Sequence, residues 1–212
     1  MKTVSQPAQG GLAFATPGDW FAIRLPRERV DADELADELI SALHESEGPR
    51  DATVSRDGRR TVIRQLVGAC ATLDVLCAYA TVLDVPGGPL PATLVASVRS
   101  MGGYTLDRIA SEMSAADDAV QAPAVGILDL PAGRTVRVER LREMPGAADG
   151  RHPVSFIVQY IAEGAAAGQA VLLTFSTPAV ALADQLRLLF HQIACTLRFD
   201  GRDRLGGPES QP

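Results

Sequence analysis

The sequence predicts an α+β fold in which a single antiparallel sheet of about six to eight strands is flanked by helices. Apolar segments of strand length follow one another along the chain, and their connections are too short for parallel crossovers. Amphipathic helical patterns precede, interrupt and follow this series. The segments 156–161 and 171–175 are apolar on both sides, which predicts an α/β/α sandwich with helices on both faces of the sheet.

The amino-terminal part predicts a hairpin and then a helix. Residues 14–16 and 20–25 flank a Pro-Gly-Asp sequence at 17–19, which is typical of a short hairpin turn. Asp31 is the expected N-cap of the helix, with Glu34 three residues later in a capping-box arrangement. Leucines then recur every four residues while acidic residues occupy the other faces.

The rest of the chain predicts a second helix over 57–73, a hairpin of strands 74–84 and 92–98, and a short helix over 104–113 capped by Thr105. Four strands in a meander follow at 125–130, 134–142, 154–162 and 169–176. Pro178 opens the last helix, and 196–199 adds an edge strand. The apolar stripe of that helix comprises Leu182, Leu186, Leu189 and Ile193.

The ends of the chain differ from its middle in composition. Residues 1–11 and 200–212 are small, polar and rich in glycine, and we interpret both as flexible tails. No low-complexity linker or repeat divides the segment between them. We therefore expect one domain over 12–199.

Charge is unevenly placed along the 212 residues, whose formal net charge is -6. Residues 31–51 hold eight acidic side chains and a single arginine, so the remaining chain is close to neutral. This distribution lacks the clustered cations that nucleic acid requires, and we expect no nucleic-acid partner. We find no secretory signal and no membrane-spanning run, and the three cysteines form no disulfide framework, so we expect a cytoplasmic protein without membrane insertion.

Linear catalytic motifs are missing from the sequence. It has no Gly-x-Ser-x-Gly elbow, no phosphate-binding loop that ends in Gly-Lys-Ser/Thr and no Gly-x-Gly-x-x-Gly turn. Three histidines stand apart from one another, and three cysteines lie on faces predicted to be buried, where inert packing is favoured over a reactive thiolate. We expect a protein that is not an enzyme and has no metal or cofactor; the histidines are His44, His152 and His191, and the cysteines are Cys70, Cys77 and Cys195.

Charged rows on the predicted elements suggest a protein-docking role. Acidic pairs four residues apart line one side of the first helix, either as a solvated face or as a surface for a basic partner. Arginines on the strand 134–142 could meet this helix within the fold or across a subunit contact, or remain solvated. The candidate docking residues are Asp33, Asp37, Glu34, Glu38, Arg137 and Arg140. Trp20 and Phe21 either anchor the hairpin or form an exposed contact pair.

Three segments carry a resemblance to a known family: TPGDWFAI at 16–23, LLTFSTP at 172–178 and FxxIAxTLRF at 190–199. With these, the chain from 12 to 199 resembles uncharacterised actinobacterial proteins that have the fold shared by PsbP and the Ran-binding Mog protein, some of which accompany type VII secretion gene clusters. The resemblance implies an antiparallel sheet between helices and no catalytic residues. The photosynthetic and Ran-related roles do not transfer with the fold.

These observations lead to a hypothesis of a non-enzymatic protein that acts through protein–protein contact, as an accessory of a type VII secretion or envelope system. A homodimer through a strand edge or sheet face is a second expectation. The alternative is a small-ligand-binding domain with an apolar cleft between sheet and helix. Its expected lining is Leu76, Ala78, Ala80, Leu94 and Ala96. An enzyme with scattered residues is the third hypothesis.

Overall fold

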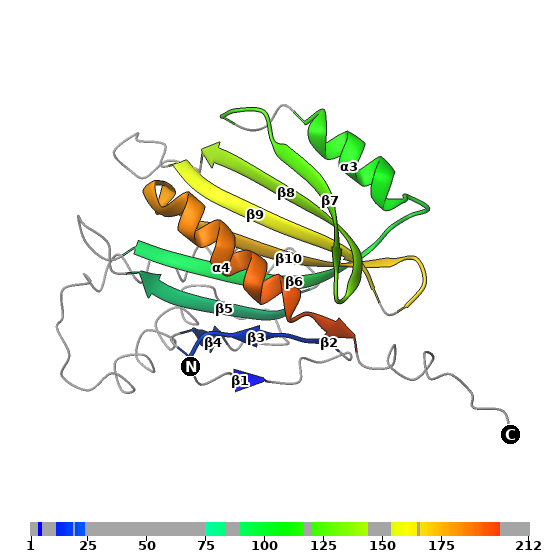
Figure 1. Cartoon of the computed structure of the whole chain (residues 1–212). Coiled ribbons are helices and arrows are strands. Elements are labelled where there is room, and N and C mark those ends of the chain that lie inside the picture. Colours follow the sequence, from blue (N-terminus) through cyan, green and yellow to red (C-terminus); the bar gives the residue numbers. More distant parts are fainter. Residues whose placement is uncertain are drawn as a thin grey trace, which may run out of the picture.

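The computed structural model describes residues 4–5, 12–18, 20–23, 75–83, 90–116, 120–143, 154–164 and 166–199. Its main feature is a seven-stranded antiparallel sheet in the order β4-β5-β6-β10-β9-β8-β7 (Figure 1). The helix α4 crosses one face of this sheet, and α3 packs on the opposite face beside β7 and β8. The predicted α+β class with one antiparallel sheet is confirmed.

The strands of the main sheet are β4 (Phe21–Ile23), β5 (Val75–Leu83), β6 (Leu90–Ser100), β7 (Ala124–Leu130), β8 (Gly133–Glu143), β9 (Val154–Glu163) and β10 (Gln169–Thr177). The helices are α3 (Leu106–Ser114), the 3₁₀ turn η1 (Val180–Leu182) and α4 (Ala183–Cys195). Two small two-stranded sheets pair β1 (Val4–Ser5) with β3 (Ala15–Thr16), and β2 (Leu12–Ala13) with β11 (Arg198–Phe199).

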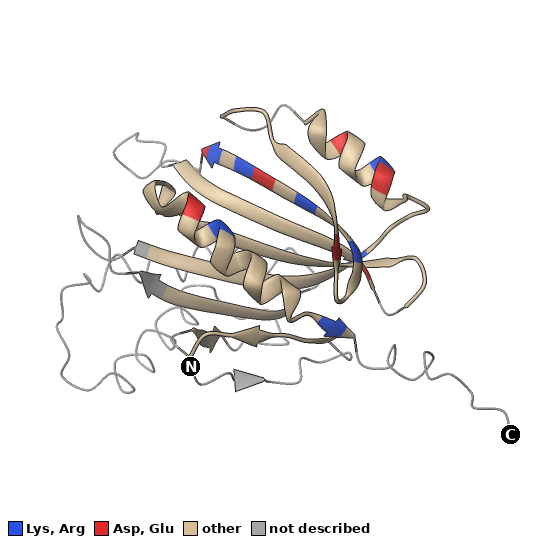
Figure 2. Cartoon of the chain, viewed as in Figure 1, with Lys and Arg blue, Asp and Glu red and all other residues tan. Residues whose placement is uncertain are grey.

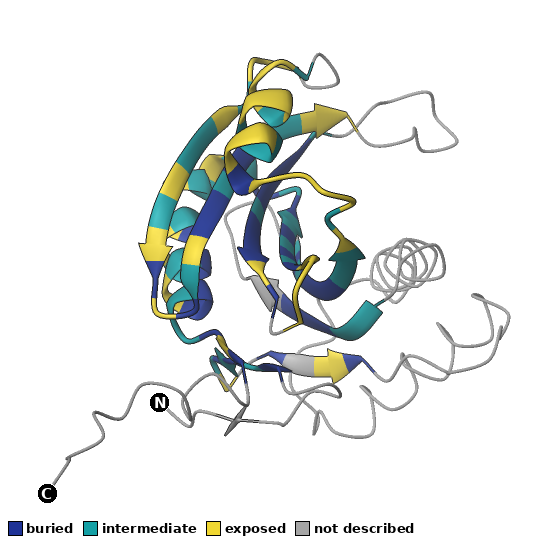
Figure 3. Cartoon of the chain, turned by 90° about the vertical axis from the view of Figure 1, so that its right-hand side faces the viewer, coloured by how far each residue is buried: buried dark blue, intermediate teal, exposed yellow. Residues whose placement is uncertain are grey.

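The meander and the β5–β6 hairpin agree with the sequence prediction. Strands β7 to β10 pair in chain order, and β10 also pairs with β6, which joins the hairpin to the meander. The sheet curves, and its buried residues concentrate in the middle strands (Figure 3). The predicted cap of α3 is also present, because Thr105 Oγ1 accepts a hydrogen bond from the Arg108 backbone amide.

An aromatic core fastens α4 to its face of the sheet. The rings of Phe175 on β10 and Phe190 on α4 stack with centroids 4.5 Å apart. Trp20 stands edge-on to both rings at 6.4 and 6.5 Å. Trp20 is buried, as expected for an anchor of the amino-terminal segment, whereas the side chain of Phe21 lies outside what the structure describes. Such edge-to-face and stacked pairs add stability beyond the apolar area that they bury.

A separate apolar cluster fastens α3 to the opposite face. Leu106 of α3 packs on Val136 and Val138 of β8 and on Ile161 of β9. These strand residues alternate with residues that face α4, because successive side chains of a strand point to opposite faces. Both faces of the sheet therefore bury apolar side chains.

The predicted amino-terminal hairpin is wrong. The turn itself forms, since the Trp20 amide donates to the Pro17 carbonyl at 3.1 Å. The flanking strands diverge, however: β3 pairs with β1, and β4 pairs with β5. Burial of Trp20 in the aromatic core explains the divergence, because it directs the following residues to the edge of the main sheet.

Two other boundaries differ from expectation. The segment after Pro178 first makes the 3₁₀ turn η1, so that α4 begins at Ala183. Strand β11 pairs with β2 rather than with the main sheet. Strand β1 lies within the expected amino-terminal tail, whereas the predicted helices at 31–43 and 57–73 and the carboxyl-terminal tail lie outside the described residues.

Candidate functional site

Polar side chains line the contact between α4 and the β8–β9 part of the sheet. We call them the polar seam: Arg137, Glu139, Tyr160, Asp184, Arg187, His191 and Cys195. The helix contributes positions 187, 191 and 195, which lie on one side of α4 because residues four apart on a helix are neighbours. The strands contribute residues of the face that packs against α4. The charges of described residues lie mainly on β8, α3 and the first turns of α4, whereas β10 has none (Figure 2).

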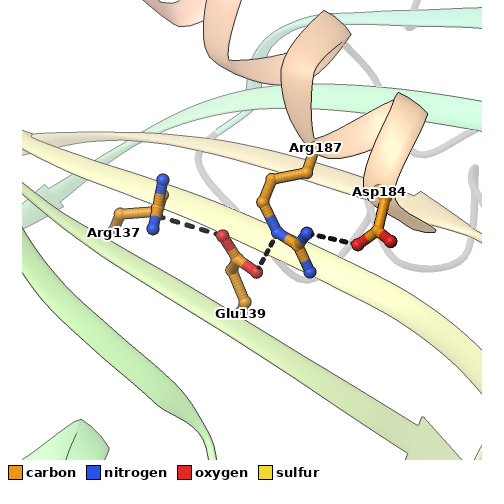
Figure 4. A network of polar contacts seen from close by, with 4 residues as sticks. All are labelled: Arg137, Glu139, Asp184 and Arg187. Carbon is orange, nitrogen blue, oxygen red and sulfur yellow. Dashed lines mark hydrogen bonds and ion pairs between the residues drawn. The ribbon is translucent and has the colours of Figure 1, made fainter.

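Glu139 is the centre of the seam (Figure 4). Its side chain is 8% exposed, and Arg187 donates from Nε to its Oε2 at 2.6 Å. The Nε atom of Arg137 lies 3.1 Å from its other oxygen, Oε1. Arg187 also donates from Nη1 to Oδ1 of Asp184 at 2.6 Å. Two guanidinium groups and two carboxylates thus alternate across the contact.

The electrostatic consequence is a neutral network that ties α4 to β8. A carboxylate buried as deeply as Glu139 needs partners, because an unpaired buried charge is costly. Hydrogen bonds from its guanidinium to Glu139 and Asp184 raise the pKa of Arg187, so its charge is retained. The seam therefore fixes the position of the helix against the sheet.

The far end of the seam holds an aromatic, an imidazole and a thiol. Tyr160 is 1% exposed, and its hydroxyl has no hydrogen-bond partner among the described residues. Burial raises the pKa of Tyr160, with Arg137 opposing part of the shift. Its ring centroid lies 6.2 Å from that of His191, whose Nε2 is 3.5 Å from Cys195 Sγ. A thiol beside an imidazole is a pairing used by nucleophilic enzymes.

A small recess lies on the other side of α4. Its volume is about 140 Å³, and its exposed lining is mostly apolar. We call it the α4 recess; its lining is Ala15, Thr16, Pro17, Leu189, Gln192, Ile193 and Thr196. The thiol–imidazole pair does not line it. The recess is thus separate from the polar seam.

The position of β3 against the end of α4 creates this recess. Thr196, the C-cap of α4, accepts a hydrogen bond at Oγ1 from the Ala15 backbone amide at 2.8 Å. The same oxygen lies 2.7 Å from the Ile193 carbonyl, to which it donates. One threonine hydroxyl therefore holds the amino-terminal segment beside the last turn of the helix.

An exposed leucine lies next to the recess. Leu188 is 66% exposed, the largest exposed fraction among the large apolar side chains that the structure describes. It precedes Gln192, which lines the recess, by one helical turn, so both lie on the same side of α4. An apolar side chain beside an apolar recess is an arrangement found in protein interfaces.

The predicted docking residues do not form one surface in the described part of the chain. The four acidic candidates, Asp33, Glu34, Asp37 and Glu38, lie outside the described residues. Arg137 faces α4, whereas Arg140 lies on the opposite face, where its Nη2 donates to Gln159 Oε1 at 2.9 Å. Two residues that are three positions apart on a strand have side chains on opposite faces of the sheet.

The residues proposed to line an apolar cleft are also divided between faces. Leu94 and Ala96 belong to the core under α4, with Leu76 packed against it. Ala78 and Ala80 pack with Val95 on the other face. These residues therefore do not line a common space.

Sequence reasoning missed Leu188 and the His191–Cys195 contact, although the sequence holds a signal for each. Leu188 falls outside the apolar stripe of the last helix, so its position on the helix predicts exposure. His191 and Cys195 are four residues apart, which places them on one side of a helix. Of the three histidines and three cysteines, only His191, Cys77 and Cys195 lie in described segments.

The described residues offer neither a metal site nor a membrane-spanning helix. No three His, Cys, Asp or Glu side chains of the described segments gather as metal ligands do. None of the helices in these segments is long and apolar enough to cross a membrane. No protein-family model matches the chain, and no curated protein matches its sequence.

Proposed function

We propose that the protein acts by binding another protein through the outer side of α4, and not by catalysis. The observation that supports this most strongly is the position of Leu188, largely exposed, beside the apolar α4 recess. A single exposed leucine is common on protein surfaces, but Leu188 and the adjoining apolar recess together form a contiguous apolar patch, which is the feature that marks interaction sites. The binding surface that we propose comprises Leu188, Gln192 and the rim of the recess.

The size of the recess favours a protein side chain as its occupant. Its volume of about 140 Å³ is less than half of the roughly 300 Å³ at which small-molecule sites begin. It is close to the roughly 150 Å³ of an apolar cavity that holds one benzene-sized group. One aliphatic or aromatic side chain of a partner matches this volume. A free ligand of cofactor size does not.

The distribution of charge on this surface also indicates the chemical character of the partner. Residues 185, 188 and 192 on the exposed side of α4 are uncharged, and Asp184 and Arg187 of the same helix neutralise each other. Arg198 follows the helix and donates to the Cys195 carbonyl at its end. The partner should therefore present an uncharged apolar segment with one anchoring side chain. A component of a secretion or envelope system, the class implied by the sequence resemblance, is the first partner to examine.

Rigidity of α4 supports a binding role. The aromatic core holds one side of the helix, and the polar seam holds another. A surface that is already ordered loses little conformational entropy when it binds. We infer that α4 presents Leu188 in a fixed position rather than adapting to each partner.

A site-specific crosslinking experiment tests this function. A photoreactive phenylalanine analogue is placed at position 188, and a matched variant has it at position 120, because Val120 is also largely exposed but lies far from α4 in sequence. The proposal predicts one major protein crosslinked from position 188 and not from 120. The captured protein is then purified and titrated against the wild type, Leu188→Asp and Gln192→Trp.

The two substitutions act by different means. Leu188→Asp removes the apolar contact, and Gln192→Trp covers the recess without adding charge. We expect each to weaken the binding at least about tenfold, which corresponds to roughly 1.4 kcal/mol. Val120→Asp should leave the affinity unchanged. Equal crosslinking from both positions, or equal affinity of all variants, would contradict the proposal.

A further inference from the structure

The main sheet ends in an edge strand that has exposed residues and that α3 contacts on one face. Strand β7 is the outer strand on one side, and among the described strands it pairs only with β8 (Figure 1). Ile127, in the middle of β7, is 38% exposed, and Ala124 and Asp129 are exposed as well. An edge strand presents a row of backbone N–H and C=O groups that another strand can bind.

The two border strands of the sheet differ in length and therefore in how many backbone groups each can offer to another strand. Among the described strands, the opposite border is β4, of which the structure describes three residues, whereas β7 has seven in a continuous register with β8. Soluble proteins usually protect a long edge with charged side chains, especially lysine, with proline, with a bulge, or with a covering helix or loop. The helix α3 contacts β7 and β8 on one face of the sheet, and Asp129 is the one charged side chain of β7. Within β7 there is no lysine, arginine or proline, and the register shows no bulge. Prolines at 123 and 131 directly flank the strand and limit pairing to these seven residues.

We propose that β7 pairs with β7 of a second copy of the chain, in antiparallel orientation, and so joins two sheets into one. This dimer is independent of the function proposed for α4. An antiparallel pair of identical strands has twofold symmetry, and the register that pairs all seven residues is centred on Ile127. Each Ile127 then lies opposite the Ile127 of the second copy.

Charge supports a second copy as the occupant of this edge. Asp129 is the single charged residue of β7, and its cross-strand neighbour within the same chain is Arg134. In the register centred on Ile127, Asp129 lies opposite Val125 of the other copy, so no like charges meet. The isoleucine pair at the centre is of the β-branched type that stabilises cross-strand contacts.

The size of the contact sets the expected affinity. Seven residues on each side form a small interface, and small interfaces are transient. We therefore expect a dimer that dissociates in the micromolar range. Sedimentation velocity of the purified chain, at concentrations up to about 0.5 mM, should show the mass rising from one to two copies.

Charge substitutions at the twofold axis give the sharpest test. Ile127→Lys places two like charges opposite each other, and so does Ile127→Asp, so each variant alone should remain monomeric. Mixed in equal amounts, the two variants should form a heterodimer, because lysine then lies opposite aspartate. Ala22→Lys is the matched control, since Ala22 is an exposed residue of β4 at the opposite border of the sheet, and this variant should dimerise like the wild type.

Three results would overturn the dimer. The first is a wild-type chain that remains a monomer at every concentration, and the second is dissociation of the dimer by Ala22→Lys but not by Ile127→Lys. The third is a mixture of the two Ile127 variants that stays monomeric although each variant shows the far-ultraviolet circular dichroism of the wild type. The circular dichroism measurement separates failure to pair from failure to fold.

Discussion

Arg187 on α4 donates a hydrogen bond of 2.6 Å to Glu139 on β8, and this contact joins the last helix to the meander beside the apolar core that α4 covers. Glu139 has a second guanidinium, Arg137, 3.1 Å from its other carboxylate oxygen. Because the carboxylate is buried and both arginines are about two-thirds buried, the group is worth more than an exposed ion pair.

Replacing Glu139 by glutamine should destabilise the protein. The amide keeps the shape of the side chain but removes the charge that two arginines surround, and we expect the free energy of unfolding to fall by about 2–3 kcal/mol. The matched control is Glu112→Gln, which removes the exposed pair with Arg108 on α3 and should cost at most about 0.5 kcal/mol. Urea denaturation measures both. Equal losses in the two variants would show that the buried network contributes no more than a surface pair.

Removing the Tyr160 hydroxyl should leave stability unchanged or raise it. The hydroxyl is buried without a hydrogen-bond partner among the described residues, so Tyr160→Phe removes an unsatisfied polar group and keeps the ring in the aromatic core. We expect a change between zero and about 1 kcal/mol in favour of the folded state. A loss above about 1 kcal/mol would indicate that the hydroxyl is bonded, and Arg137, which opposes the rise in the pKa of Tyr160, is the candidate donor.

The same tyrosine should make stability depend on alkaline pH. Burial raises the pKa of Tyr160 and also that of Tyr79, whose shift is increased by Cys77. A raised pKa in the folded state means that stability is complete below the unfolded value, about 10, and falls as pH rises through the folded pKa.

Urea denaturation between about pH 8 and 11 measures this effect. The wild-type free energy of unfolding should decline above about pH 10, Tyr160→Phe should decline less, and the double variant with Tyr79→Phe should decline least. Tyr104→Phe changes an exposed tyrosine and serves as the control. An alkaline decline that is the same in all four proteins would contradict the assignment to buried tyrosines.

Thr196 should hold the amino-terminal segment in place. Thr196→Val removes the hydroxyl that accepts from the Ala15 amide and leaves that amide without its partner, at an expected cost of about 1–2 kcal/mol. Hydrogen exchange of the Ala15 amide should become faster, whereas exchange in α3 should not change. Ser114→Ala removes an exposed hydroxyl and should alter stability by less than about 0.5 kcal/mol. Unchanged exchange at Ala15 would mean that other contacts position β3.

The elements that sequence reasoning predicted are those determined by local patterns. The β5–β6 hairpin and the meander from β7 to β10 have strands and turns close together in sequence, and the α3 cap depends on one residue. The amino-terminal hairpin was predicted wrongly because its second strand pairs with a partner that is distant in the sequence. Strand β4 pairs with β5, more than fifty residues later, and a local turn signal carries no information about such a partner.

Some features of the candidate site can be predicted from the sequence, and others depend on the tertiary fold. The separation of Arg137 from Arg140 follows from the two-residue period of a strand, and that period was available in the sequence. The polar seam cannot be predicted from the sequence, because Glu139 and Arg187 meet only when α4 packs back over the meander. Exposure of Leu188 follows from its place outside the apolar stripe, but the adjoining recess depends on where β3 lies against α4.

The most direct test of the proposed function compares the wild-type protein with Leu188→Asp as immobilised baits in extract of the native cells, at moderate salt, with Val120→Asp as the control. We expect one stoichiometric protein to be retained by the wild type and by Val120→Asp and to be lost from Leu188→Asp. The same protein, once purified, should bind the wild-type chain directly. Retention of that protein by Leu188→Asp, or no retained protein on any bait, would contradict the claim that the outer side of α4 is a protein-binding surface.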